Sequence, residues 1–254
     1  MLPADEHPHY IEFRHVYKTF DKPVLVDSNF HVNPGETVAI IGRSGVGKSV
    51  TLSHIMGFLK PDQGRVIVAH EDITNFNEEQ LRRIRKKVTM VFQSGALFDS
   101  LTVAENVLFS LELREDYDRQ NKEDVVNGLL HMVDIAGARD AYPADLSTGY
   151  KRAVAIARAV AAQPQCILYD EPTTMVDPIM SGHLSDLMLR LKHQLKLTSV
   201  VVTHDLDLMY KVADRVVFLY EGGVIFFGPV AKLAGSDHPH IQEFLELDRV
   251  VKVG

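Results

Sequence analysis

The stretch GRSGVGKS, residues 42–49, constrains the fold of this chain more than any other. It fits the pattern G-x-x-x-x-G-K-[ST]. The apolar run Thr37–Ile41 precedes it, and a helical pattern of apolar residues follows it and stops before Pro61. Its three glycines let the backbone curl so that N–H groups point inward, beside the partial positive charge of a helix N-terminus. A strand, a phosphate-binding loop and a helix are therefore predicted.

Four side chains in two segments have the chemistry that a nucleoside triphosphate requires. Lys48 would reach the β- and γ-phosphates, and Ser49 would hold Mg²⁺. The run CILYDE, residues 166–171, is an apolar strand that brings Asp170 to its C-terminal end, where this residue can bind Mg²⁺ through water. Glu171 can orient and deprotonate the attacking water. The pattern G-x-G-x-x-G is not present at this loop, which disfavours a dinucleotide cofactor.

The rest of the chain predicts an α/β fold with a parallel core sheet. A helix with apolar residues on one face separates strand-like runs at 166–170 and 199–203, and this β-helix-β alternation is typical of parallel sheets. The opening, from YIEFRHV to the turn at 33–36, predicts a small antiparallel layer. Further elements are predicted as strands at 62–70 and 88–92, mainly helix over 95–163 with a polar loop near 114–124, a hairpin turned at 221–223, and a short helical tail.

Composition excludes several classes of protein. The formal net charge is −7, whereas a nucleic-acid binder needs an excess of Lys and Arg, so no nucleic-acid partner is expected. The basic cluster at 82–87 is interpreted as a solvated or subunit-facing surface. The single Cys166 cannot form an internal disulfide, which favours a reducing compartment. No secretory signal is expected at the N-terminus, and no apolar run approaches the roughly 18 to 20 residues of a membrane helix.

Four further motifs give the chain a family resemblance. They are VFQ, ending at Gln93; LSTGY, residues 146–150; DEPTTMVD, ending at Asp177; and VVTHD, which contains His204. With the phosphate loop, in this order and at these spacings, the chain resembles the nucleotide-binding subunit of an ATP-binding-cassette (ABC) transporter from about residue 10 to 230. The resemblance implies a P-loop NTPase fold and a Mg²⁺-dependent ATP hydrolase.

The resemblance also implies an organisation of the chain and roles for its residues. Residues 1–254 form one nucleotide-binding domain, with an ATP-binding core at about 10–93 and 164–228, a helical subdomain at about 94–163 and a C-terminal tail at about 229–254. The implied nucleotide contacts are Phe20, Gly42, Arg43, Ser44, Gly45, Val46, Gly47, Lys48, Ser49, Val50, Ser147, Gly149 and Asp177. The implied catalytic residues are Lys48, Gln93, Glu171 and His204, and the metal contacts are Ser49, Gln93 and Asp170.

LSTGY departs from the family signature L-S-G-G-Q. Ser147 can cap the following helix and donate its hydroxyl to a γ-phosphate oxygen, and Gly149 is expected to leave its N–H open to the same phosphate. Thr148 adds a β-branched side chain, and Tyr150 replaces an amide with a larger aromatic ring. ATP binding and hydrolysis are therefore predicted to persist, with altered dimer affinity or rate.

The resemblance further implies partners and a location. In this family two subunits close head to tail, each ATP lies between the phosphate loop of one and the signature of the other, and the motion passes to a separate integral membrane permease. A homodimer is favoured here because this chain keeps its own catalytic positions, although the sequence leaves a heterodimer open. The expected location is the cytoplasmic face of the inner (plasma) membrane, peripherally, through the permease.

Two segments suggest the transported cargo. MVFQSGALFDSLTVAENV, residues 90–107, and LYDEPTTMVDPI resemble the lipid-transport branch of the maintenance-of-lipid-asymmetry (Mla) type, which works with a permease and a mammalian-cell-entry (MCE) domain protein. Phospholipid transport is therefore the first expectation. The alternatives are the ATPase of another ABC importer or exporter, a soluble ABC ATPase acting on a protein partner, and a non-hydrolysing ATP-binding regulator.

Overall fold

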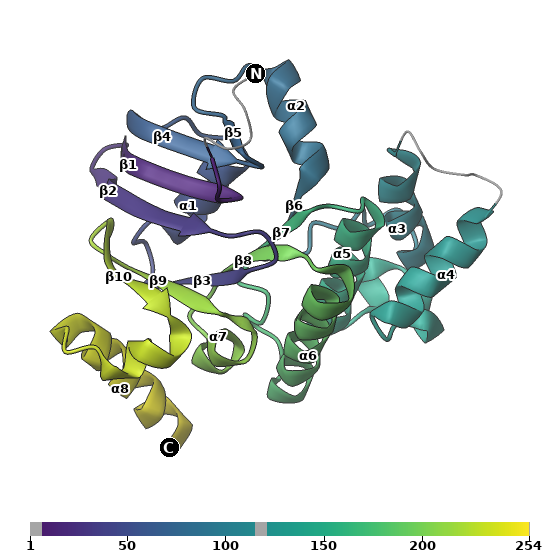
Figure 1. Cartoon of the computed structure of the whole chain (residues 1–254). Helices are drawn as coiled ribbons and strands as arrows, with labels where there is room; N and C mark the ends of the chain where they lie inside the picture. The colour runs from purple at the N-terminus through teal and green to yellow at the C-terminus, as the bar shows by residue number, and fades with distance from the viewer. Residues whose placement is uncertain (1–6, 115–120, 254) are drawn as a thin grey trace.

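The strands of the chain form two sheets (Figure 1). The computed structural model describes residues 7–114 and 121–253, with side chains through residue 246. The larger sheet has the order β10-β9-β3-β8-β7-β6 and is parallel except for the antiparallel hairpin of β9 and β10. Its strands are β3 (Thr37–Ile41), β6 (Val88–Val91), β7 (Cys166–Asp170), β8 (Thr198–Val202), β9 (Arg215–Tyr220) and β10 (Gly223–Pro229). The predicted parallel core sheet is confirmed.

The predicted antiparallel layer is confirmed as a separate four-stranded sheet. Its order is β2-β1-β4-β5, and every pairing in it is antiparallel. The strands are β1 (Ile11–Thr19), β2 (Pro23–Val32), β4 (Gln63–Val68) and β5 (Glu71–Asp72). Helix α1 (Lys48–Ile55) packs between the sheets, because its Leu52 and Ile55 share one buried cluster with Phe13 of β1 and Ile40 of β3.

The side chains of β3 alternate between two cores, which explains its continuous apolar run. Val38 and Ile40 face the cluster that contains α1, whereas Ala39 and Ile41 face a second cluster on the opposite side. All five residues of the strand are buried. The phosphate loop therefore begins at the end of a strand that is packed on both faces.

The remaining helices surround this sheet (Figure 1). They are α2 (Glu78–Lys87), α3 (Val103–Glu112), α4 (Lys122–Met132), α5 (Thr148–Ala161), α6 (Pro178–Leu195), α7 (Leu206–Val212) and α8 (Pro239–Val253). The three helices α3, α4 and α5 bury side chains in one cluster that also includes Val91 of β6 and Ile167 of β7. Because this core is shared with the sheet, the separation of 94–163 from an ATP-binding core remains a prediction. Part of the predicted polar loop, 115–120, lies outside the described residues.

Helix α1 is shorter than its apolar periodicity predicts. The pattern continues to Leu59, but the helix ends at Ile55, and Gly57 follows with φ of +67°. A Cβ atom on Gly57 would lie 2.3 Å from Cδ2 of Leu81 in α2, so close packing requires glycine here. The N–H groups of Gly57 and Phe58 donate to the carbonyl oxygens of His54 at 3.0 Å and of Ser53 at 2.8 Å, so a local turn with glycine at a positive φ ends α1.

Helix α2 includes the basic cluster and was not expected as a helix, because Leu81 and Ile84 are its only buried residues. It begins at Asn77, whose side chain accepts a hydrogen bond from the backbone N–H of Gln80 in a reciprocal capping box. Arg85 pairs with Glu78, and Lys87 pairs with Glu71 at 2.9 Å. These ion pairs lie within the chain, and the interpretation of the cluster as a solvated or subunit-facing surface remains a prediction.

The C-terminal tail packs on its own domain. A 3₁₀ helix (Val230–Gly235) leads to α8, and Ile241 and Leu245 of α8 are buried in one cluster with Ile41 of β3 and Phe218 of β9. In Figure 1, α8 lies beside the β9–β10 hairpin, at the side away from α3 and α4. Within the described ranges, no helix is both long enough and apolar enough to cross a membrane.

Candidate active site

The loop after β3 has a backbone that only glycine can adopt at two positions. Gly42 and Gly47 have φ of +145° and +105°. A Cβ on Gly42 would lie 2.3 Å from the carbonyl oxygen of Leu219, and one on Gly47 would lie 2.7 Å from that of Val24. The loop leads directly into the first turn of α1, so the free N–H groups of the helix start are available to an anion.

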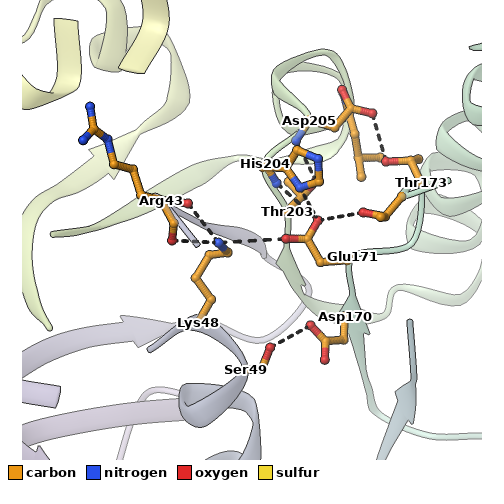
Figure 2. Close-up of polar contacts among 12 residues, drawn as sticks. Arg43, Lys48, Ser49, Asp170, Glu171, Thr173, Thr203, His204 and Asp205 are labelled. Carbon is orange, nitrogen blue, oxygen red and sulfur yellow. Dashed lines mark hydrogen bonds and ion pairs between the residues drawn. The ribbon is translucent and has the colours of Figure 1, made fainter. Parts of the chain in front are cut away.

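Lys48 lies at the floor of the loop. Its Nζ donates to the carbonyl oxygens of Gly42 at 2.9 Å and of Arg43 at 3.1 Å, and it lies 3.9 Å from Oε1 of Glu171 (Figure 2). Burial lowers the pKa of Lys48, and the nearby carboxylates of Glu171 and Asp170 oppose this shift. A polyphosphate anion would compensate the buried ammonium further, so the position suits a triphosphate.

Ser49 and Asp170 form the side of the site that suits a metal ion. Oγ of Ser49 donates to Oδ1 of Asp170 at 3.2 Å, and burial raises the pKa of this carboxyl. Hydroxyl and carboxylate oxygens are the ligands that Mg²⁺ prefers, and such sites use one or two protein oxygens together with phosphate oxygens of the substrate. This donor pair fits Mg²⁺, which would neutralise charge on the phosphates when bound.

Glu171 is held in position by strained backbone and by two loops. Its φ is +49°, an uncommon value for a residue with a side chain, and its N–H donates to the carbonyl oxygen of Val202 at 2.9 Å. Oε2 accepts from Oγ1 of Thr174 at 3.2 Å and lies 2.8 Å from Nδ1 of His204. Because a carboxylate only accepts, the imidazole donates its Nδ1 proton here. The structure thus brings the predicted base into contact with His204, another predicted catalytic residue.

Asp205 connects the loops that position these two residues. Its Oδ2 accepts from Oγ1 of Thr173 at 2.9 Å, and its Oδ1 accepts from the backbone N–H of Leu208 and so caps α7 (Figure 2). Its own N–H donates to Oγ1 of Thr203 at 3.0 Å. The segment after β7 and the segment after β8 are therefore fixed relative to each other.

The phosphate loop opens into a pocket of about 750 Å³. Twelve of the residues with predicted roles line it: Phe20, Gly42, Arg43, Ser44, Gly45, Gly47, Lys48, Ser49, Val50, Gln93, Glu171 and His204. Phe20 is 53% exposed, which leaves its ring available to stack on a base. Val24, Thr174 and Phe244 also line the pocket and were not predicted.

Val46 and four further predicted residues do not line this pocket. Asp170 is not among the lining residues and accepts a hydrogen bond from Ser49, which is. Ser147 lies at the start of α5, where its Oγ accepts a hydrogen bond from the backbone N–H of Tyr150 at 3.4 Å. Asp177 caps α6, because its side chain accepts a hydrogen bond from the backbone N–H of Met180 at 2.9 Å. Ser147, Gly149 and Asp177 therefore do not complete the chain's own site.

Gly149 is buried rather than open. A Cβ there would lie 2.1 Å from Cγ of Met180 and 3.3 Å from Cγ1 of Val176. Met180 covers the side of Gly149 on which a Cβ would lie, and the expectation that its N–H is open to a phosphate remains a prediction. The missing side chain allows α5 to pack closely on the start of α6.

Replacing Gly149 with Ala is expected to destabilise the fold by about 1–3 kcal/mol, since overpacking displaces Met180. Adding Met180→Ala should recover much of the loss by making space. Gly182→Ala is the matched control, because nothing lies within 4 Å of a Cβ there. The measurement is urea unfolding, and a Gly149→Ala variant as stable as wild type would contradict the packing argument.

This arrangement of loop, lysine, metal-side oxygens and glutamate is that of a P-loop nucleoside triphosphate hydrolase. A family model described as "ABC transporter" matches residues 25–174, more than half of the chain. The chain belongs to the ABC transporter family. It is an ATP-hydrolysing, transport-coupled ATPase that binds ATP with Mg²⁺.

Several curated relatives are similar over nearly the whole chain. The methionine import ATP-binding protein MetN 2 of Pseudomonas entomophila is 37% identical over 250 residues, which covers 96% of this chain and 75% of the relative. MetN 1 of Pseudomonas putida is 36% identical with the same coverage. Both names describe the ATP-binding proteins of importers.

Solved structures share the fold. A dimeric ATP-binding cassette in a post-hydrolysis state, bound to ADP and Pi, superposes with a TM-score of 0.79 at 30% identity and covers 87% of this chain and 98% of that one. The structure of cbiO1 from Clostridium perfringens, described as part of the ABC transporter complex cbiONQ, has a TM-score of 0.83 at 26% identity. The match covers 97% of this chain and 98% of that one.

Proposed function

We propose that this chain is the ATPase subunit of a membrane importer and works as a pair of copies on a separate permease. The observation on which this depends is that the catalytic groups surround one pocket while Ser147 and Asp177 lie outside it. A second copy placed head to tail would supply those two residues to the first copy's ATP. The solved structure described as dimeric supports a pair of copies.

The names of the relatives favour an importer. They are methionine import proteins at 36–37% identity, so methionine is the first cargo to test. The predicted phospholipid cargo and MCE-domain partner have no support among these relatives and rest only on the resemblance of residues 90–107 and 168–179. The permease would hold the chain peripherally at the cytoplasmic face of the inner membrane.

Affinity purification of the tagged chain from membranes tests the proposal. The expected result is copurification of a second copy and an integral membrane permease, with ATP turnover in the reconstituted complex that rises when methionine and its binding protein are added. Copurification of an MCE-domain protein with phospholipid would replace the importer with the lipid-transport alternative. Recovery with cytosolic proteins alone would contradict the permease.

A further inference from the structure

The C-terminal helix α8 contacts the phosphate loop. Nη2 of Arg43, the second residue of the loop, donates to Oε1 of Glu243 in α8 at 2.6 Å. Phe244, the next residue of α8, lines the nucleotide pocket together with Lys48 and His204. Residues about 200 positions apart in the sequence therefore meet at the edge of the ATP site.

Helix α8 is anchored, so Glu243 does not reach Arg43 from a free tail. Ile241 and Leu245 are buried, and the ring of Phe244 packs edge-on against Phe218 with centroids 5.1 Å apart. One turn earlier, the ring of His240 stacks on Tyr220 at 3.9 Å. This packing orders the backbone of α8 before the pair forms, whereas the side chains of Arg43 and Glu243 are 53% and 52% exposed, so the pair remains open to solvent.

Arg43 belongs to the phosphate loop through its backbone. Its carbonyl oxygen accepts from Nζ of Lys48 at 3.1 Å, whereas its side chain points away from the ammonium (Figure 2). An unpaired guanidinium at this position would be attracted to a polyphosphate, because Arg makes charge-assisted hydrogen bonds to phosphate oxygens. In the pair, its charge is neutralised by Glu243.

We propose that Glu243 sets the affinity of the site for ATP by pairing with Arg43 and keeping that guanidinium off the phosphates. Helix α8 then tunes the charge at the edge of the pocket, so that a change in the position of α8 would change the affinity for ATP. The proposal concerns nucleotide binding by the single chain and holds whichever cargo the transporter moves.

Equilibrium binding of a fluorescent ATP analogue to the purified full-length chain, at low ionic strength, tests this. Glu243→Gln should bind about two- to fivefold more tightly, because it removes a negative charge and frees Arg43. Arg43→Gln should bind more weakly by a similar factor, since the positive charge of Arg43 is lost and Glu243 keeps only its 3.7 Å contact with His240. In the Arg43→Gln background, adding Glu243→Gln should tighten binding by less than it does in wild type, because there is no Arg43 side chain to free. The changes in affinity caused by the two single substitutions should shrink in high salt.

Glu246→Gln is the matched control, because Glu246 is an exposed residue of the same helix and undergoes the same change of charge. The proposal is overturned if Glu243→Gln binds more weakly than wild type, or if it behaves like Glu246→Gln. It is overturned equally if the gain is undiminished when Arg43 is already Gln, because the effect would then not pass through Arg43. Thermal unfolding without nucleotide verifies that each variant is folded.

Discussion

Replacing Glu171 with Gln is expected to lower ATP turnover by roughly 10²- to 10⁴-fold and to leave ATP binding nearly unchanged. Glutamine keeps the size of the side chain and can still bond Thr174, which lies 3.2 Å from Oε2. It cannot accept a proton from water at neutral pH. The variant therefore removes the general base and keeps the pocket.

The measurements are phosphate release and equilibrium binding of a fluorescent ATP analogue. Glu79→Gln, an exposed residue in the first turn of α2, is the matched control and should hydrolyse ATP like wild type. Wild-type turnover by Glu171→Gln would remove Glu171 from the chemistry. Loss of binding would instead assign Glu171 a structural role in the pocket.

The side chains of this chemistry could be predicted because each follows directly from a local pattern. Strand β7 has the predicted bounds, 166–170, since a strand buried on both faces is a short apolar run with clear ends. Asp170 and Glu171 then follow from the end of that strand. The positions of Lys48 and Ser49 likewise follow from the strand-loop-helix context.

Other features depend on contacts between distant segments and leave no local signal. The role of Gly149 depends on Met180, and the place of Phe244 in the pocket depends on how α8 packs against β9. Helix α2 has too few apolar residues for periodicity to reveal it.

Replacing Lys48 with Met is expected to weaken ATP binding on the order of 10- to 100-fold, the loss that follows from removing hydrogen bonds to charged groups. Methionine has a similar length and no charge, so it can occupy the buried position without the desolvation that lowers the pKa of Lys48. The phosphates would then face Glu171 and Asp170 without the intervening ammonium. Lys232→Met, at an exposed position, is the matched control.

Thermodynamic linkage separates this loss of binding from a loss of folding. At an ATP concentration 100 times the wild-type Kd, ATP should stabilise wild type by about 2.7 kcal/mol, and Lys48→Met by only about 0.4 to 1.4 kcal/mol if its affinity is 10- to 100-fold lower. Without nucleotide, Lys48→Met should be less stable than wild type, because the carbonyl oxygens of Gly42 and Arg43 lose their donor and Glu171 loses its nearby cation. Equal stabilisation of both proteins by ATP would show that Lys48 does not contact the nucleotide.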